Sequence, residues 1–310
     1  MGAGRYAPSP SGELHLGNLR TALLAWLFAR STGRGFLLRV EDLDRARAGA
    51  EELQLADLRA IGLDWDGPVV RQTGRTEAYR AVIATLRQAG LLYECFCTRR
   101  DIAEASSAPH AAPGAYPGTC RNLTEAERSL RRAQRPAALR LRTDIDQFTV
   151  TDVLHGTFTG LVDDFVVVRN DGVPAYNLAV VVDDALQGID QVVRGDDLLP
   201  STPRQAHLAV LLAQLGAVPA DRSTVPPQYA HVPLVLNGDG KRLAKRDGSV
   251  TLSQLRHDGV TAERVRSVLL ESAGLPGTSL EAAVEAFDPA SLPREPWVST
   301  GFPTPSAGMH

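Results

Sequence analysis

The residues with the clearest chemical potential lie within residues 5–18, RYAPSPSGELHLGN. A strand followed by a Pro/Ser/Gly loop that opens a helix brings free backbone N–H groups and the positive end of the helix dipole to one point. His15 can donate to a phosphate oxygen, Gly17 lets a nucleotide approach the backbone, and Asn18 adds another donor. The segment therefore predicts a phosphate site, although H-x-G-N alone also describes a helix start with a satisfied histidine.

Three cysteines form a second candidate site. Cys95 and Cys97 stand two residues apart, and Cys120 follows with Tyr116 four residues before it. Three thiolates and one oxygen are enough for a closed tetrahedral zinc site. An odd number of cysteines in one short stretch argues against a disulfide framework. On chemistry alone His110 is the expected fourth ligand, because Cys₃His sites are common. Three unligated thiols are the alternative.

The composition is that of an ordinary globular chain. Of 310 residues, 44% are apolar and 22% charged. No apolar run is long enough to span a membrane, and residues 1–8 contain no signal-peptide core. We therefore expect a soluble cytoplasmic protein of two or three modules, without membrane contact.

Basic residues are concentrated in one segment, which we call the arginine patch. The net charge of −3 gives no overall sign of nucleic-acid binding, but seven arginines here face only Glu125 and Glu127. An RNA contact and a solvated, arginine-rich helix fit this patch equally well when it is taken alone. The patch comprises Arg121, Arg128, Arg131, Arg132, Arg135, Arg140 and Arg142.

Strands and helices must position these groups, and their alternation predicts a parallel sheet built from βαβ units. An insert containing the cysteines and the arginine patch splits this sheet. Within it, residues 148–168 and the turn at residues 170–172 (NDG) predict antiparallel strands. The parallel-sheet strands are expected at residues 4–7, 36–40 and 191–194, and the helices at 16–30, 51–61, 76–89 and 201–215.

Five segments together resemble the glutamyl- and glutaminyl-tRNA synthetases of class I. R-x-A-P-S-P-S-G followed by H-L-G-N is similar to the family's HIGH signature. Four later segments agree with the family in the same order, which makes a chance match implausible. They are residues 39–44 (RVEDLD), 176–179 (YNLA), 193–198 with 201–205 (VRGDDL and STPRQ), and 242–248 (RLAKRDG).

The resemblance implies an α/β fold. It comprises a Rossmann-type HUP catalytic domain with a parallel sheet, an inserted α+β zinc-containing domain, and a short helical region like a stem-contact domain. No anticodon-binding domain is expected. The expected limits are 1–92 and 176–230 for the catalytic halves, 93–175 for the insert, 231–287 for the KMSKS loop and helical region, and 288–310 for an irregular proline-rich tail.

The resemblance also implies an ATP site. His15, Asn18 and Lys245 would be catalytic, and Gly17 and Arg242 would contact ATP, which brings Mg²⁺ with it. An ammonium such as that of Lys245 stabilises charge that develops on the transferring phosphate and on pyrophosphate. Arg242 and Ala244 depart from the lysine and serine that are usual in the KMSKS loop, which puts the dynamics of the loop and the rate in question.

A glutamate site follows from the same resemblance. Arg5, Ala7 and Ser9 would line it. Glu41 would accept from the α-ammonium, Tyr176 would close over the substrate, and Arg194 would add a second guanidinium. Arginine suits this task because it meets a carboxylate with two parallel hydrogen bonds.

The short relatives of glutamyl-tRNA synthetase share the spacing of the cysteines. They place Cys-x-Cys, Tyr and Cys around zinc, which favours Cys95, Cys97, Tyr116 and Cys120 as ligands over a set with His110. One structural Zn²⁺ is then expected.

The zinc pattern and the short C-terminal part point to the glutamyl-Q tRNA(Asp) synthetase branch, whose members glutamylate queuosine in the anticodon of tRNA(Asp). The expected partners are L-glutamate, ATP and the anticodon stem-loop, which the arginine patch could contact through phosphates. No protein partner is indicated, and a monomer is expected. The alternatives are a truncated glutamyl-tRNA synthetase that charges a tRNA 3′ end and a non-catalytic tRNA-binding paralog.

Overall fold

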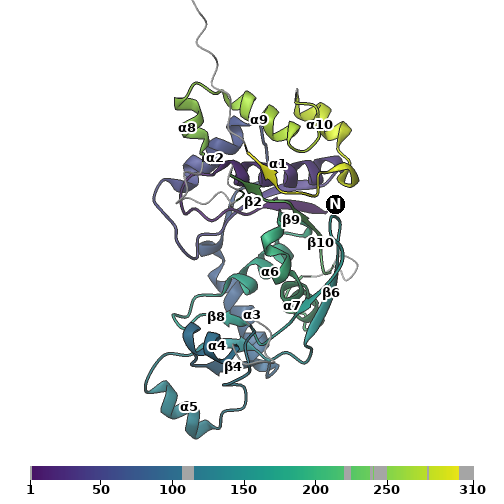
Figure 1. The fold of residues 1–310 in the computed structure, drawn as a ribbon. Coiled ribbons are helices and arrows are strands. Elements are labelled where there is room, and N and C mark those ends of the chain that lie inside the picture. Colours follow the sequence, from purple (N-terminus) through teal and green to yellow (C-terminus); the bar gives the residue numbers. More distant parts are fainter. Residues whose placement is uncertain are drawn as a thin grey trace, which may run out of the picture.

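A seven-stranded, mainly parallel sheet forms the centre of the molecule (Figure 1). The computed structural model describes residues 2–106, 115–219, 225–237, 240, 250–277 and 279–299. The strand order is β3-β2-β1-β9-β10-β6-β7, and only β6 and β7 pair antiparallel. The strands are β1 (Ala3–Tyr6), β2 (Gly35–Val40), β3 (Val70–Arg71), β6 (Gln147–Asp152), β7 (Gly156–Leu161), β9 (Ile189–Gly195) and β10 (Gln228–Val232).

Helices cover both faces of this sheet (Figure 1). The amphipathic pattern of each helix buries one side against the strands, which produces one core cluster on each face. The predicted α/β fold with a mainly parallel sheet is confirmed. One face carries α1 (Leu16–Ser31), α9 (Ala262–Glu271) and α10 (Leu280–Ala286), and the other carries α3 (Thr76–Gln88), α6 (Tyr176–Leu186) and α7 (Thr202–Gln214); α2 (Ala50–Ala60) and α8 (Leu252–His257) complete the α1 side.

The order in which strands are added to the parallel sheet reverses at β1. β2 and β3 follow on one side of β1, whereas β9 and β10 lie on the other. In open parallel sheets, the crevice at such a switch point, beyond the carboxyl ends of the strands, is the preferred ligand site. This topology brings the ends of β1, β2 and β9 together although they are far apart in the sequence.

A smaller antiparallel sheet lies at the far end of the molecule (Figure 1). It contains β4 (Leu92–Cys95), β5 (Ala138–Leu141) and β8 (Val166–Val168), with α4 (Arg99–Ser106) and α5 (Glu125–Arg132) beside it. Residues 93–175 therefore contribute to both sheets, because β6 and β7 extend the large one. The antiparallel pairing predicted within residues 148–168 is confirmed by the β6–β7 hairpin.

A buried arginine joins the C-terminal part to the large sheet and its covering helix α1. Arg20 on α1 donates to the carbonyl of Pro233 over 2.9 Å and to the hydroxyl of Ser272 over 3.0 Å. Burial lowers the pKa of Arg20 to about 10. Further along, β12 (Trp297–Val298) pairs with β11 (Val235–Leu236), so the first part of the proline-rich segment is joined to the core. No helix among the described residues could cross a membrane.

Candidate active site

A cavity of about 270 Å³ opens at the carboxyl ends of β1 and β9. All of the predicted glutamate and ATP residues that the structure describes line it, so the sequence segments do converge in space. Arg242 and Lys245 lie outside the described residues. The lining includes Arg5, Ala7, Ser9, His15, Gly17, Asn18, Glu41, Tyr176 and Arg194.

His15 and Asn18 cap the start of α1 reciprocally. The Nδ1 atom of His15 accepts from the backbone N–H of Asn18, and the Asn18 side chain accepts from the backbone N–H of His15, each over 3.3 Å. A neutral imidazole that accepts at Nδ1 carries its hydrogen on Nε2. His15 is therefore oriented as an Nε2–H donor, which suits a phosphate oxygen.

Gly17 makes room for this imidazole. A Cβ atom at residue 17 would lie 3.1 Å from two ring atoms of His15. The backbone beside His15 is also fixed, because Leu16 donates to the carbonyl of Val250 over 3.1 Å and His15 forms a bridge with Thr251. The chain that follows the predicted KMSKS segment, from Val250, is thus attached next to His15.

The loop that precedes α1 is held by hydrogen bonds. Ser9 donates through its hydroxyl to the carbonyl of Glu41 over 3.0 Å, and the backbone N–H of Glu41 donates to Pro8 over 2.9 Å. From α2, the side-chain amide of Gln54 donates to the carbonyls of Ser9 and Gly12. These contacts connect the phosphate loop to the end of β2.

Arg39 on β2 is the centre of a buried ion network. Its Nη1 atom donates to Asp184 over 2.8 Å, and Arg5 on β1 donates to the same carboxylate oxygen over 3.1 Å. The Arg39 guanidinium also lies 3.7 Å from Asp183 and 3.6 Å from Glu41. Two strands and α6 are thereby joined beneath the cavity.

Burial and charge act in opposite directions on these carboxyl groups. Burial raises the pKa of Glu41, and Arg39 and Arg5 offset only part of that increase. Burial acts on Asp184 in the same direction, but Arg5 and Arg39 outweigh it and hold the pKa of Asp184 below its ordinary value. Asp184 is therefore an ionised partner shared by two guanidinium groups.

Arg194 has a different environment. It is buried at the end of β9, with 5% of its surface exposed. Its guanidinium donates to three neutral side chains, those of Thr202, Gln205 and His231. Among the described residues, no carboxylate lies within ion-pair distance of it. A buried cation without an opposite charge is costly, so the site favours an anionic ligand.

Tyr176 stands at the open side of the cavity. It is the first residue of α6 and is 44% exposed. Its ring lines both this cavity and a larger one of about 1050 Å³ that extends to Cys95 and Cys97. Tyr176 is thus in a position to contact a ligand that enters from either side.

The predicted cysteine cluster also forms. The three sulfur atoms of Cys95, Cys97 and Cys120 lie within 4.8 Å of one another. The Tyr116 hydroxyl is 3.4 Å from the sulfur of Cys95 and accepts the backbone N–H of Cys120 over 2.8 Å. Sulfur and oxygen ligands at this spacing can hold a metal ion. His110 lies outside the described residues.

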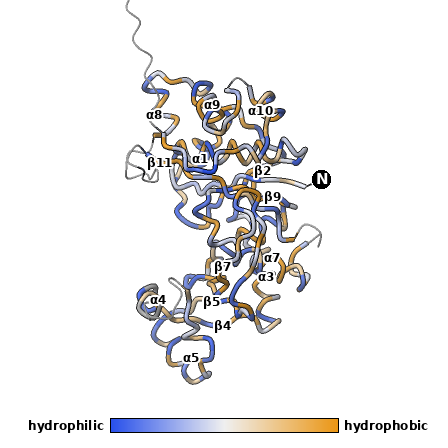
Figure 2. The backbone as a smooth tube through the Cα atoms, turned by 45° about the vertical axis from the view of Figure 1, so that its right-hand side comes forward, coloured by the Kyte–Doolittle hydropathy of each residue, from blue (hydrophilic) through white to orange (hydrophobic). Residues whose placement is uncertain are grey.

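The arginine patch is used largely for internal contacts. Arg121 and Arg132 each lie 2.6 Å from a carboxylate oxygen, and Arg140 is buried over the Tyr116 ring. Arg135 instead lines the larger cavity. Figure 2 shows α5, which carries part of the patch, as strongly hydrophilic. The surface that the patch offers to RNA is consequently smaller than its composition indicates.

The sequence match covers almost the whole chain. Residues 3–293 match the family described as tRNA synthetases class I (E and Q), catalytic domain. The chain belongs to this family. It is 65% identical to a glutamyl-Q tRNA(Asp) synthetase of Nocardia farcinica over 96% of this chain and 93% of that protein. It is 51% identical to one of Cutibacterium acnes, over 99% and 83% respectively.

A solved structure of the same family has the same fold. The glutamate-tRNA synthetase of Elizabethkingia anophelis matches with a TM-score of 0.78 at 29% identity, over 96% of this chain and 68% of that one. As a member of the class I (E and Q) family, the chain is an aminoacyl-tRNA synthetase-type ligase.

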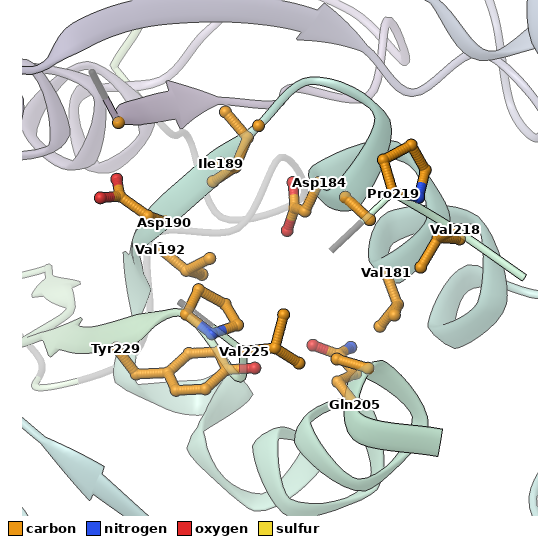
Figure 3. A pocket seen from close by; sticks show the side chains of 15 residues that line it. Val181, Asp184, Ile189, Asp190, Val192, Gln205, Val218, Pro219, Val225 and Tyr229 are labelled. Carbon is orange, nitrogen blue, oxygen red and sulfur yellow. The ribbon is translucent and has the colours of Figure 1, made fainter. Parts of the chain in front are cut away.

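Sequence reasoning missed the residues that support this synthetase site. Asp183 and Asp184 follow three consecutive valines in α6, so paired carboxylates at the end of a buried apolar run were the available signal. A cavity of about 330 Å³, which Asp184 and Gln205 reach from α6 and α7, borders this support (Figure 3). Partners of both Arg5 and Arg194 thus lie along it.

Replacing Arg39 tests the buried network. R39M should lower the free energy of unfolding by about 3–5 kcal/mol, because it leaves three carboxylates without their shared cation. The loss should shrink as pH falls, since protonation removes the uncompensated charges. Urea unfolding at about pH 8 and about pH 5.5 measures both effects.

The matched control is R30M, because Arg30 pairs with Asp64 and Asp66, which are largely exposed. That change should cost no more than about 1 kcal/mol. An R39M cost as small as that of R30M would contradict a structural role for the buried network.

Proposed function

We propose that the chain activates L-glutamate with ATP and transfers it to the queuosine base in the anticodon of tRNA(Asp). The observation that carries the first half is Arg194, a buried cation without a carboxylate partner in the described residues, facing the predicted ATP loop across one cavity. The names of the relatives support the second half.

The charges around the cavity favour glutamate. The three guanidiniums of Arg5, Arg39 and Arg75 are matched by three carboxylates. These carboxylates are those of Glu41, Asp183 and Asp184, so Arg194 is left as one unmatched positive charge. Asp197 also lines the cavity but is exposed at its rim, where water screens it. Glutamate carries one net negative charge at neutral pH and glutamine carries none, so glutamate completes the balance.

The proposed contacts of glutamate use the lining residues. Arg5 and Arg194 would bind its carboxylates, and Glu41 would accept from the α-ammonium. Ala7 and Ser9 would line the site at the backbone, which the hydrogen bond from Ser9 to Glu41 holds in place. Tyr176 would cover the bound substrate from α6.

The chemical step needs positioning and charge stabilisation. A carboxylate oxygen of glutamate forms a bond to the α-phosphorus of ATP as the bond to the leaving pyrophosphate breaks. His15 would donate from Nε2 to a phosphate oxygen, with Asn18 fixing its orientation. Lys245 and Arg242 remain predicted phosphate contacts, and Mg²⁺ would accompany ATP. The acceptor nucleophile then attacks the activated carbonyl, and AMP leaves.

The larger cavity is a suitable path for the acceptor. It is continuous from Tyr176 to Cys97. Its lining includes Arg45, Arg135 and Arg169, and Asp44 offsets part of the charge of Arg45 and Arg169. A nucleotide entering there would have its phosphates near these cations and its base near the activated glutamate.

A structural Zn²⁺ would complete the cysteine cluster. Cys95, Cys97, Tyr116 and Cys120 are the proposed ligands, and their spacing suits a four-coordinate ion. Such an ion would join β4 to the loop before α5 and so stabilise one wall of the larger cavity.

Exchange of pyrophosphate into ATP tests the activation step. Glutamate-dependent exchange is expected without tRNA. R194K should raise the KM for glutamate at least about tenfold, because an ammonium cannot reproduce the two-pronged contact. The KM for ATP should stay unchanged. R204K is the control, since Arg204 pairs with Asp163 outside the cavity. Absence of exchange under all conditions would disprove the proposed activity.

Labelled glutamate identifies the acceptor. Queuosine-containing tRNA(Asp) should be labelled and queuosine-lacking tRNA(Asp) should not. Removal of the 3′-terminal adenosine should leave the labelling intact. Equal labelling of the two tRNAs, or dependence on the 3′ adenosine, would favour a truncated glutamyl-tRNA synthetase instead.

Metal analysis tests the cysteine cluster. The purified chain should contain one Zn²⁺, and C120S should lose it because a thiolate ligand is removed. Y116F should weaken zinc retention against a chelator, whereas H110A should not. The reverse order for these two variants would make His110 the fourth ligand.

A further inference from the structure

Arg194 is fixed by three acceptors from two elements. Its Nη1 atom donates to Gln205 over 2.7 Å and its Nη2 atom to Thr202 over 2.9 Å, both on α7. Its Nε atom donates to Nε2 of His231 on β10 over 3.1 Å. His231 is the register partner of Arg194 in the neighbouring strand. Two of the five N–H groups of the guanidinium then remain for a carboxylate.

The contact with Arg194 is compatible with only one position of the ring hydrogen of His231. Arginine only donates, so Nε2 of His231 must be an acceptor and the hydrogen must be on Nδ1. Nδ1 lies 2.6 Å from Oδ2 of Asp152, which accepts that hydrogen. Nε2 also lies 3.0 Å from the Thr202 hydroxyl, so the opposite tautomer would direct its N–H group between this hydroxyl and the N–H group of Arg194, and the hydrogen bond from Arg194 would be lost.

Asp152 is held so that this arrangement is the favoured one. Its Oδ1 atom accepts three backbone N–H groups, from Leu154, His155 and His231, over 2.9 to 3.3 Å. Its Oδ2 atom faces the His231 ring. The side chains of Asp152 and His231 are both fully buried, so water does not compete for these contacts.

We propose that Asp152 and His231 are positioning residues that fix Arg194 by imposing the Nδ1–H tautomer of His231. Neither residue touches the reacting atoms. The inference rests on the proposed role of Arg194 as a glutamate ligand. It goes beyond that role because it assigns the geometry of the glutamate site to a carboxylate two strands away from Arg194.

The other groups around His231 are compatible with a neutral ring. His155 contacts the backbone carbonyl of His231 over 3.0 Å, and Tyr229 stacks beside the ring. Burial lowers the pKa of His231, Asp152 opposes this, and Arg194 adds to it. The ring is therefore neutral at neutral pH. The ring should gain a proton only as pH falls below the ordinary histidine pKa of about 6.5. Its Nε2–H group would then face the N–H group of Arg194.

The decisive variant is D152N. Because Oδ1 receives three backbone donors, the asparagine must direct its amide nitrogen at Nδ1 of His231. Nδ1 then becomes an acceptor and the hydrogen moves to Nε2, against Arg194. The expected result is a tautomer change in the ¹⁵N spectrum of His231 and a rise in the KM for glutamate of about tenfold or more. The KM for ATP should be unchanged.

Two further variants separate positioning from general damage. H231Q can still offer a carbonyl oxygen to Arg194, so in that background D152N should add little to the KM for glutamate. D190N is the matched control, because Asp190 is a partly buried aspartate that pairs with Arg34 at the opposite end of β9. It should leave the KM for glutamate unchanged.

The outcomes are distinguishable from failure of the proposed function. Absence of glutamate-dependent exchange in the unmodified chain would disprove the function. Exchange in the unmodified chain, combined with a changed tautomer and a normal KM in D152N, would overturn the inference alone. An unchanged tautomer of His231 in D152N would also overturn it. So would an equal effect of D152N on the KM for glutamate in the unmodified chain and in the H231Q background. A KM for glutamate that rises in acid for the unmodified chain but not for H231Q would support it.

Discussion

Buried guanidinium groups at the carboxyl edge of one parallel sheet are the constraint on which the rest of the site depends. Arg5, Arg39 and Arg194 each stand near the end of a different strand and are almost fully buried. Charges in such a place must be paired or hydrogen-bonded. The two aspartates of α6 and the polar side chains of α7 meet this need, so the packing of both helices against the sheet is tied to the chemistry of the site.

The sequence predicted the parts of this arrangement that local pattern determines. The helix that begins after His15, the strand that carries Arg194 and the cysteine cluster all follow from spacing and residue type. The side chains that hold Arg194 could not be predicted in this way. Asp152 and His231 are 79 residues apart and meet only through the pairing of β6 with β10. Long-range strand pairing has no local signal, so these contacts required the structure.

The arginine patch shows the limit of composition as a guide. Local charge density indicates a cationic surface, but an arginine side chain can also pack on an aromatic ring and donate to a backbone carbonyl inside the protein. Arg140 does so, since it stacks on Tyr116 and donates to the carbonyl of Asp164. Two arginines that lie outside the patch in the sequence, Arg45 and Arg169, line the larger cavity instead, where both pair with Asp44.

Under the proposed function, the contrast between Arg5 and Arg194 would give the site its selectivity. Arg5 shares Asp184 with Arg39 and is electrostatically satisfied before any substrate binds. Arg194 has neutral partners and keeps its charge uncompensated. A ligand with a second carboxylate removes that cost, whereas an amide of the same shape hydrogen-bonds without neutralising it. This balance would require a neutral His231, since a protonated ring would add a second unmatched charge beside the first. Selection for glutamate over glutamine would therefore depend on keeping one buried imidazole uncharged.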